Sequence, residues 1–109
     1  MPYNEELAGR IRGALARRRL ITEKKMFGGL TFLVRGNMAC GVVGNKLMVR
    51  VGPEQYAEAL SHPDARKMDF TGRPMKGFLY VMPKGLRSDK ALAAWVERGL
   101  AFGRSLPPK

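Results

Sequence analysis

Between residues 26 and 51, short apolar runs alternate with two Gly-Asn dipeptides. The runs are rich in Val, Leu, Met and Phe, and the dipeptides are Gly36-Asn37 and Gly44-Asn45. A two-residue hairpin loop requires positive φ angles at its central positions, which glycine and asparagine adopt at low cost. The pattern therefore predicts a three-stranded antiparallel meander with a Gly-Asn pair at each turn.

The two turns determine which residues of the meander lie opposite one another. Leu33 is expected to face Cys40, which in turn faces Val49, and Phe32 is expected to face Gly41. Opposed residues share a face of the sheet, and successive residues alternate between faces. The first face, which we expect to be the core face, collects Thr31, Leu33, Cys40, Val42, Leu47, Val49 and Val51. The second face collects Leu30, Phe32, Val34, Ala39, Gly41, Lys46, Met48 and Arg50. Its mixture of apolar and cationic groups predicts an interaction surface.

Three helices are predicted outside the meander. Asn4 caps the first, whose apolar positions recur every four residues up to Leu15. A middle helix opens at Gly52-Pro53-Glu54, because proline is tolerated at the first helical position, and ends at Ser61-His62-Pro63. Ser88 caps the last helix, which Pro107-Pro108 stops.

Further strands are expected at residues 20–26, 66–70 and 77–82, with a loop at residues 71–74. Helix, strands, helix, two strands and helix, in that order, predict an α+β fold. Helices would cover one face of a mainly antiparallel sheet of five to six strands. A chain of 109 residues is expected to form one domain, residues 1–109.

The chain is strongly basic, and this favours anionic partners. Twenty Lys and Arg against nine Asp and Glu give a formal net charge of +11. Such a balance is typical of proteins that bind DNA or RNA, but it also occurs in soluble basic domains without such partners. Only Arg17-Arg18-Arg19 and Lys24-Lys25 are dense spots, and the arginine run also suits the C-terminal end of the first helix.

Composition also indicates the compartment. A single cysteine cannot form an internal disulfide, which is typical of a reducing environment. The N-terminus, MPYNEEL, is acidic where a signal peptide would be basic, and no apolar run approaches the length of a membrane span. We expect a cytoplasmic protein without membrane contact.

Candidate chemistry is sparse, so we expect no catalytic, cofactor or metal site and no enzymatic activity. His62 and Cys40 are the only histidine and cysteine, too few for a structural zinc site. The run from Lys76 to Val81 resembles part of an RNA recognition motif but departs from it at Leu79 and Pro83. The alternative is that its aromatic side chains pack in the core.

Several segments together resemble the TfoX N-terminal domain family: MFGG at residues 26–29, the Gly-Asn hairpin, LMVRVGPEQY at residues 47–56 and FTGRPMKGF at residues 70–78. The resemblance implies an antiparallel sheet similar to that of secretion chaperones, often in a dimer. Full-length members are regulators of natural competence genes. Because the chain ends at Lys109, just after its last helix, we expect the C-terminal TfoX domain to be absent.

These observations predict a non-enzymatic regulatory interaction module that resembles the N-terminal domain of the competence regulator. Two alternatives are a basic domain that binds nucleic acid through its sheet face and a homodimeric adaptor that binds proteins and is unrelated to competence. The expected partners are a second copy of the chain, a protein or DNA. The expected contact surface comprises Lys24, Lys25, Phe32, Lys46, Met48, Arg50, Arg73 and Lys76.

Overall fold

A computed structural model describes residues 3–16, 18, 20–26, 28–70 and 73–108, with side chains except at positions 69–70 and 73–76. In chain order the elements are α1 (Glu5–Ala14), β1 (Ile21–Met26), β2 (Gly29–Val34), β3 (Asn37–Val43), β4 (Lys46–Arg50), α2 (Tyr56–Leu60), β5 (Ala65–Phe70), β6 (Arg73–Val81), the 3₁₀ helix η1 (Pro83–Leu86) and α3 (Asp89–Ser105).

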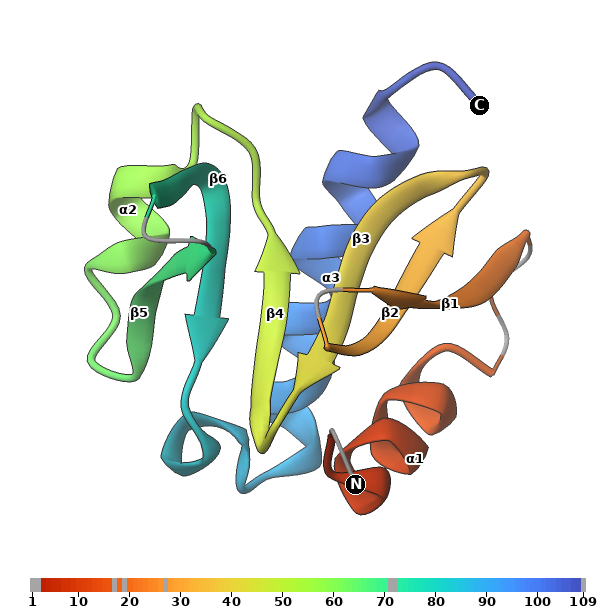
Figure 1. Ribbon diagram of the computed structural model, residues 1–109, viewed down its shortest axis with the longest axis horizontal. Coiled ribbons are helices and arrows are strands. Elements are labelled where there is room, and N and C mark those ends of the chain that lie inside the picture. The colour runs from red at the N-terminus through yellow and green to blue at the C-terminus, as the bar shows by residue number, and fades with distance from the viewer. Residues whose placement is uncertain (1–2, 17, 19, 27, 71–72, 109) are drawn as a thin grey trace.

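The six strands form one antiparallel sheet in the order β1-β2-β3-β4-β6-β5. In Figure 1, α3 lies behind β3 and β4, and α2 lies beside β5 and β6. Helix α1 packs next to α3. The predicted α+β fold, with three helices and a mainly antiparallel sheet, is confirmed. None of the described helices is long and apolar enough to cross a membrane.

One hydrophobic cluster joins the helices to the sheet. Ile11 of α1, Ala59 of α2 and Leu92 of α3 belong to the same cluster as Val49 and Leu79 of the central strands, and all are nearly or completely buried. Removing this apolar surface from water is the main favourable contribution to folding. The three helices therefore share one face of the sheet.

The caps of the two long helices are those predicted. The side chains of Asn4 and Ser88 accept hydrogen bonds from the backbone N–H groups of Leu7 and Ala91. The prediction for the middle helix is wrong at its start. Residues 53–55 form a turn, and α2 begins only at Tyr56, without a side-chain cap.

One of the two predicted hairpin turns is also wrong. Gly44-Asn45 connects β3 to β4 as expected, with Cys40 opposite Val49. The loop between β2 and β3 is instead Arg35-Gly36, and both residues have positive φ, at 52° and 85°. Asn37 thus belongs to β3 rather than to the turn.

This shift reverses the faces of β2. Ala39 is an extra residue in β3, a bulge, and Phe32 pairs with Cys40 instead of Gly41. A slip of one residue exchanges the two faces of a strand. Leu30, Phe32 and Val34 therefore lie in the core cluster, while Leu33 is only half-buried on the other face.

The Asn37 side chain supplies a physical reason for the observed register. Its amide donates a 2.9 Å hydrogen bond to the carbonyl oxygen of Pro107, and the residue is 1 % exposed. If Asn37 lay in the turn, as predicted, its side chain would not occupy this position and would not make the same contact. The contact joins the meander to the segment that follows α3.

Strand β6 is longer than predicted and bulged. It begins at Arg73 rather than near Gly77, where φ is +90°. The Gly77 carbonyl oxygen accepts hydrogen bonds from the N–H groups of Val51 and Gly52, at 2.8 and 3.1 Å. Positive φ is accessible to glycine without a steric penalty. This arrangement ends β4 and directs the chain toward α2.

Candidate functional site: the second face of the sheet

A single row of residues crosses all six strands on the face opposite the helices, which we call the second face. From one edge to the other the row is Lys24, Thr31, Gly41, Met48, Tyr80 and Arg66. The cations at its two ends are exposed, whereas Thr31 and Met48 near its centre are 2 % and 0 % exposed. The row therefore has a buried middle flanked by positive charge.

Gly41 makes the close packing of this middle possible. A β-carbon at this position would lie 2.5 Å from the carbonyl oxygen of Leu30 and 3.3 Å from the terminal methyl of Met48. Met48 occupies space that any larger residue at position 41 would require. A flexible thioether suits such an irregular gap.

Two cations on β4 lie against aromatic rings. The Lys46 ammonium is 4.5 Å from the centroid of the Tyr80 ring, and the Arg50 guanidinium is 5.3 and 5.1 Å from the rings of Phe78 and Phe102. Each contact of this kind contributes about 0.5–1 kcal/mol at a partly exposed site. Burial lowers the pKa of Arg50. These contacts orient the two cations.

When strands are compared with α-helices, the excess of positive charge lies on the strands. The six strands contain eight Lys and Arg but only two acids, Glu23 and Asp69. The three described α-helices contain five cations and five acids, so their charges balance. Ion pairs between described side chains follow this division, because each includes at least one helical residue. The excess charge within these elements therefore lies on the strands.

The structure separates the residues of the expected contact surface. Lys24 and Lys25 are exposed on the edge strand β1 but point to opposite faces, being neighbours in a strand. The register assigns Lys46 and Arg50 to the second face, where both are half-buried, and the Arg50 guanidinium reaches as far as Phe102 of α3. The backbones of Arg73 and Lys76 belong to β6, and their side chains lie outside the described part of the chain.

Phe32 and Met48 do not contribute exposed surface. Phe32 is 1 % exposed in the core cluster, so its placement on the second face is wrong for the register reason given above. Met48 lies on the second face as expected, but it is fully buried. Arg66, opposite Tyr80 and exposed, joins this face although the sequence did not single it out. The signal in the sequence would have been that the row of paired residues continues from β4 through β6 to β5.

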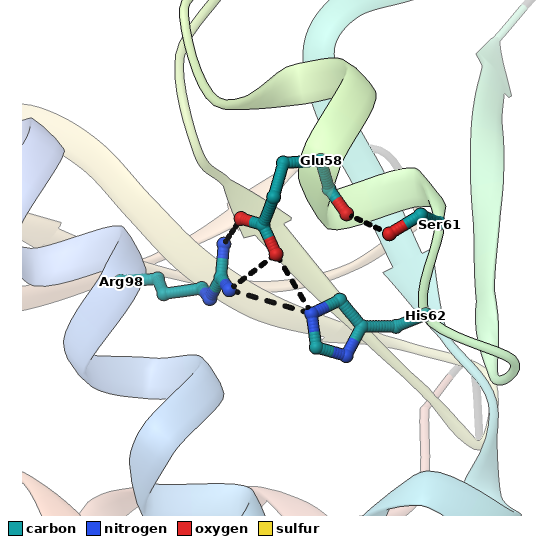
Figure 2. A network of polar contacts seen from close by, with 4 residues as sticks. All are labelled: Glu58, Ser61, His62 and Arg98. Atoms are coloured by element: carbon teal, nitrogen blue, oxygen red, sulfur yellow. Dashed lines mark hydrogen bonds and ion pairs between the residues drawn. The ribbon is translucent and has the colours of Figure 1, made fainter.

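A second polar cluster joins α2 to α3 (Figure 2). Arg98 donates hydrogen bonds to both carboxylate oxygens of Glu58, at 2.9 and 3.2 Å, and the Glu58 carboxylate also lies 3.0 Å from His62 Nε2. The hydrogen bond from Arg98 is the main cause that lowers the pKa of Glu58. Trp95 packs edge-on against His62, with ring centroids 5.1 Å apart. Sequence reasoning missed this cluster, because Glu58 and Arg98 are 40 positions apart.

This cluster has the residue types of a hydrolytic triad but a different arrangement. The Ser61 hydroxyl donates to the backbone carbonyl oxygen of Glu58, not to His62. A nucleophile must lie within hydrogen-bonding reach of its base. The geometry fits a tie between two helices.

Cys40 has the surroundings of an inert thiol, as expected. It is completely buried, and burial raises its pKa to about 12. A reactive thiol requires exposure and a lowered pKa. Among the described residues, no group of three or more His, Cys, Asp and Glu side chains is placed to hold a metal ion.

Comparison with known proteins identifies the family. No curated protein and no solved structure matches the chain significantly, so the likeness to secretion chaperones stays a prediction. The family model for the TfoX N-terminal domain matches residues 14–103, which includes the whole sheet and most of α3. The chain therefore belongs to the TfoX N-terminal domain family.

Proposed function

We propose that this domain is a non-enzymatic regulatory module that acts in transcription and contacts DNA through the second face of its sheet. Membership of the TfoX N-terminal domain family supports the regulatory role, because the resemblance described above implies that full-length members regulate natural competence genes. The observation that carries the choice of surface is a set of four strand cations that the register places on the second face: Lys24, Lys46, Arg50 and Arg66. DNA is the partner that this charge favours, because phosphate contacts dominate the affinity of basic domains.

The two exposed cations of the row provide the experiment. Fluorescence anisotropy with a labelled duplex of about 20 base pairs should show binding that weakens as salt rises from about 50 to about 300 mM. The double variant Lys24→Glu, Arg66→Glu should bind at least about tenfold more weakly, and its log–log salt slope should be shallower by about two, one for each lost phosphate contact.

A matched control changes the net charge equally on the helical side. Arg87 and Lys90 are exposed at the start of α3, and Arg87→Glu with Lys90→Glu reverses the same two charges. This control should keep most of the affinity. Equal losses in the two double variants would contradict docking through the second face, and no binding by the unaltered domain at low salt would contradict the DNA proposal.

A further inference from the structure

Three arginines from distant parts of the chain line one pocket on the helical side of the sheet. Arg18 follows α1, Arg35 lies in the turn between β2 and β3, and Arg104 belongs to the last turn of α3. The pocket has a volume of about 380 Å³. This volume is within the range of small-molecule sites, roughly 300–1,000 Å³. The pocket does not involve the row of the second face.

The charges at this pocket do not balance. Glu97 is the acid that pairs here, with Arg18 at 2.6 Å and with Arg104 at 3.0 Å. One carboxylate therefore serves two guanidinium groups. Arg35 Nε is buried and has no hydrogen-bond partner among the described residues. A buried donor left without a partner destabilises the folded protein, so an anion that accepts a hydrogen bond from Arg35 would be stabilising.

The backbone at the pocket is held in an unusual conformation. Leu20 and Arg35 are the non-glycine residues of the described chain with positive φ, at 62° and 52°. The Arg35 N–H donates a 3.0 Å hydrogen bond to the Leu20 carbonyl oxygen, so the two segments support each other. The two-residue turn requires positive φ at Arg35, and a non-glycine residue is strained there.

The apolar part of the lining indicates a ligand with more than a charged group. Leu20 is 68 % exposed and is the large apolar side chain most open to solvent among those described. Val34 and Leu100 are buried and also contribute to the lining. A ligand that covered Leu20 would remove its apolar surface from water.

We propose that this pocket binds a small organic phosphate monoester. The three arginines and Glu97 together carry two net positive charges, which a phosphate dianion would neutralise. Guanidinium groups match phosphate oxygens in bidentate geometry. The organic part of the ligand packs against the exposed side chain of Leu20.

Three probes separate the charged and apolar contributions. Phenyl phosphate carries both, inorganic phosphate carries only the charge, and benzyl alcohol carries only the ring. We expect saturable amide chemical-shift changes at Arg35 and Leu100 with phenyl phosphate. Inorganic phosphate should bind about tenfold more weakly, because it lacks the contact with Leu20. Benzyl alcohol should not produce a saturable change.

Matched variants test the arginines. Arg35→Gln and Arg104→Gln should each weaken phenyl phosphate binding by about tenfold, the effect of one lost charge-assisted hydrogen bond. Arg87→Gln removes the same charge near the opposite end of α3 and should change the affinity less than about twofold. Unchanged one-dimensional spectra and thermal midpoints show that each variant is folded. Two independent arginine variants keep the test decisive if one is unstable.

Three results would overturn the proposal. The first is no saturable change with phenyl phosphate up to about 10 mM, a concentration at which a dissociation constant in the low millimolar range would be detected. The second is equal weakening in Arg35→Gln and Arg87→Gln, which would indicate attraction by net charge alone. The third is benzoate binding as tightly as phenyl phosphate, because a monoanion lacks the second charge.

Discussion

At the scale of single residues, the buried thiol of Cys40 makes stability depend on pH. Its pKa is raised to about 12 in the folded protein, against an ordinary value of 9.0. Above that ordinary value the unfolded chain loses a proton that the folded protein keeps, so the free energy of unfolding falls as pH rises. We predict that urea denaturation at about pH 8 and about pH 10 shows a loss about 1 kcal/mol larger for the unaltered chain than for Cys40→Ala. Comparison with the variant removes the contribution of lysine and tyrosine titration, because this contribution is the same in both proteins.

The same residue offers a kinetic check on this prediction. Iodoacetamide should modify Cys40 in the folded protein only through opening of the core, and rapidly in urea. Equal rates in the two conditions would mean that the thiol is exposed, and would remove the basis for the pH prediction.

At the scale of elements, α3 approaches the bulge of β3 too closely for any side chain at one point of contact. A β-carbon at Gly99 would lie 2.2 Å from the carbonyl oxygen of Ala39. Gly99→Ala must therefore move the helix away from the strand, and we expect the free energy of unfolding to fall by about 1–3 kcal/mol. Gly9 in α1 is the control, since nothing lies within 4 Å of its β-carbon position. Gly9→Ala should raise stability by about 0.5–1 kcal/mol in the same urea titration. Equal effects would contradict close packing at Gly99.

The elements also show which features the sequence could predict. Caps such as Asn4 and Ser88 depend on neighbours three residues away, so the local pattern sufficed for the ends of α1 and α3. The Gly44-Asn45 turn is local in the same sense. The observed register of β2 comes with a bulge at Ala39 and a hydrogen bond between Asn37 and Pro107, 70 positions apart, which no turn rule contains.

The same distinction between local patterns and long-range contacts applies to the candidate sites. Alternation along β4 placed Lys46, Met48 and Arg50 on one face correctly, but depth of burial depends on Gly41 in the adjacent strand. The arginine pocket was missed because Arg35 adopts a left-handed backbone conformation. The predicted Gly36-Asn37 turn assigned the positive φ angles to Gly36 and Asn37, so no such conformation was expected at Arg35. Patterns therefore predicted faces, and long-range contacts determined which side chains are accessible.

At the scale of the whole molecule, the expected homodimer stays a prediction, and the sheet gives it a definite salt dependence. Both edge strands carry adjacent cations, Lys24-Lys25 on β1 and Arg66-Lys67 on β5, all exposed. Edge pairing or stacking of second faces would bring like charges together. We predict that sedimentation detects more dimer at about 500 mM than at about 50 mM salt, because screening weakens this repulsion.

A charge-neutralised edge provides the control for this measurement. Lys24→Gln with Lys25→Gln should form dimers at lower salt than the unaltered chain, whereas Arg87→Gln should not. A dimer that dissociates as salt rises would contradict this prediction and indicate attractive contacts between copies.

The balanced helices and cationic strands also affect how the domain meets a partner. Its charge is distributed unevenly, so a polyanion at a distance exerts a torque as well as an attraction. The domain would turn its sheet toward the partner before contact, and a larger fraction of encounters would occur in an orientation that allows binding. Charge on the strands would thus raise the rate of association, and the helical side, which holds the arginine pocket, would remain free for a second molecule in the same assembly.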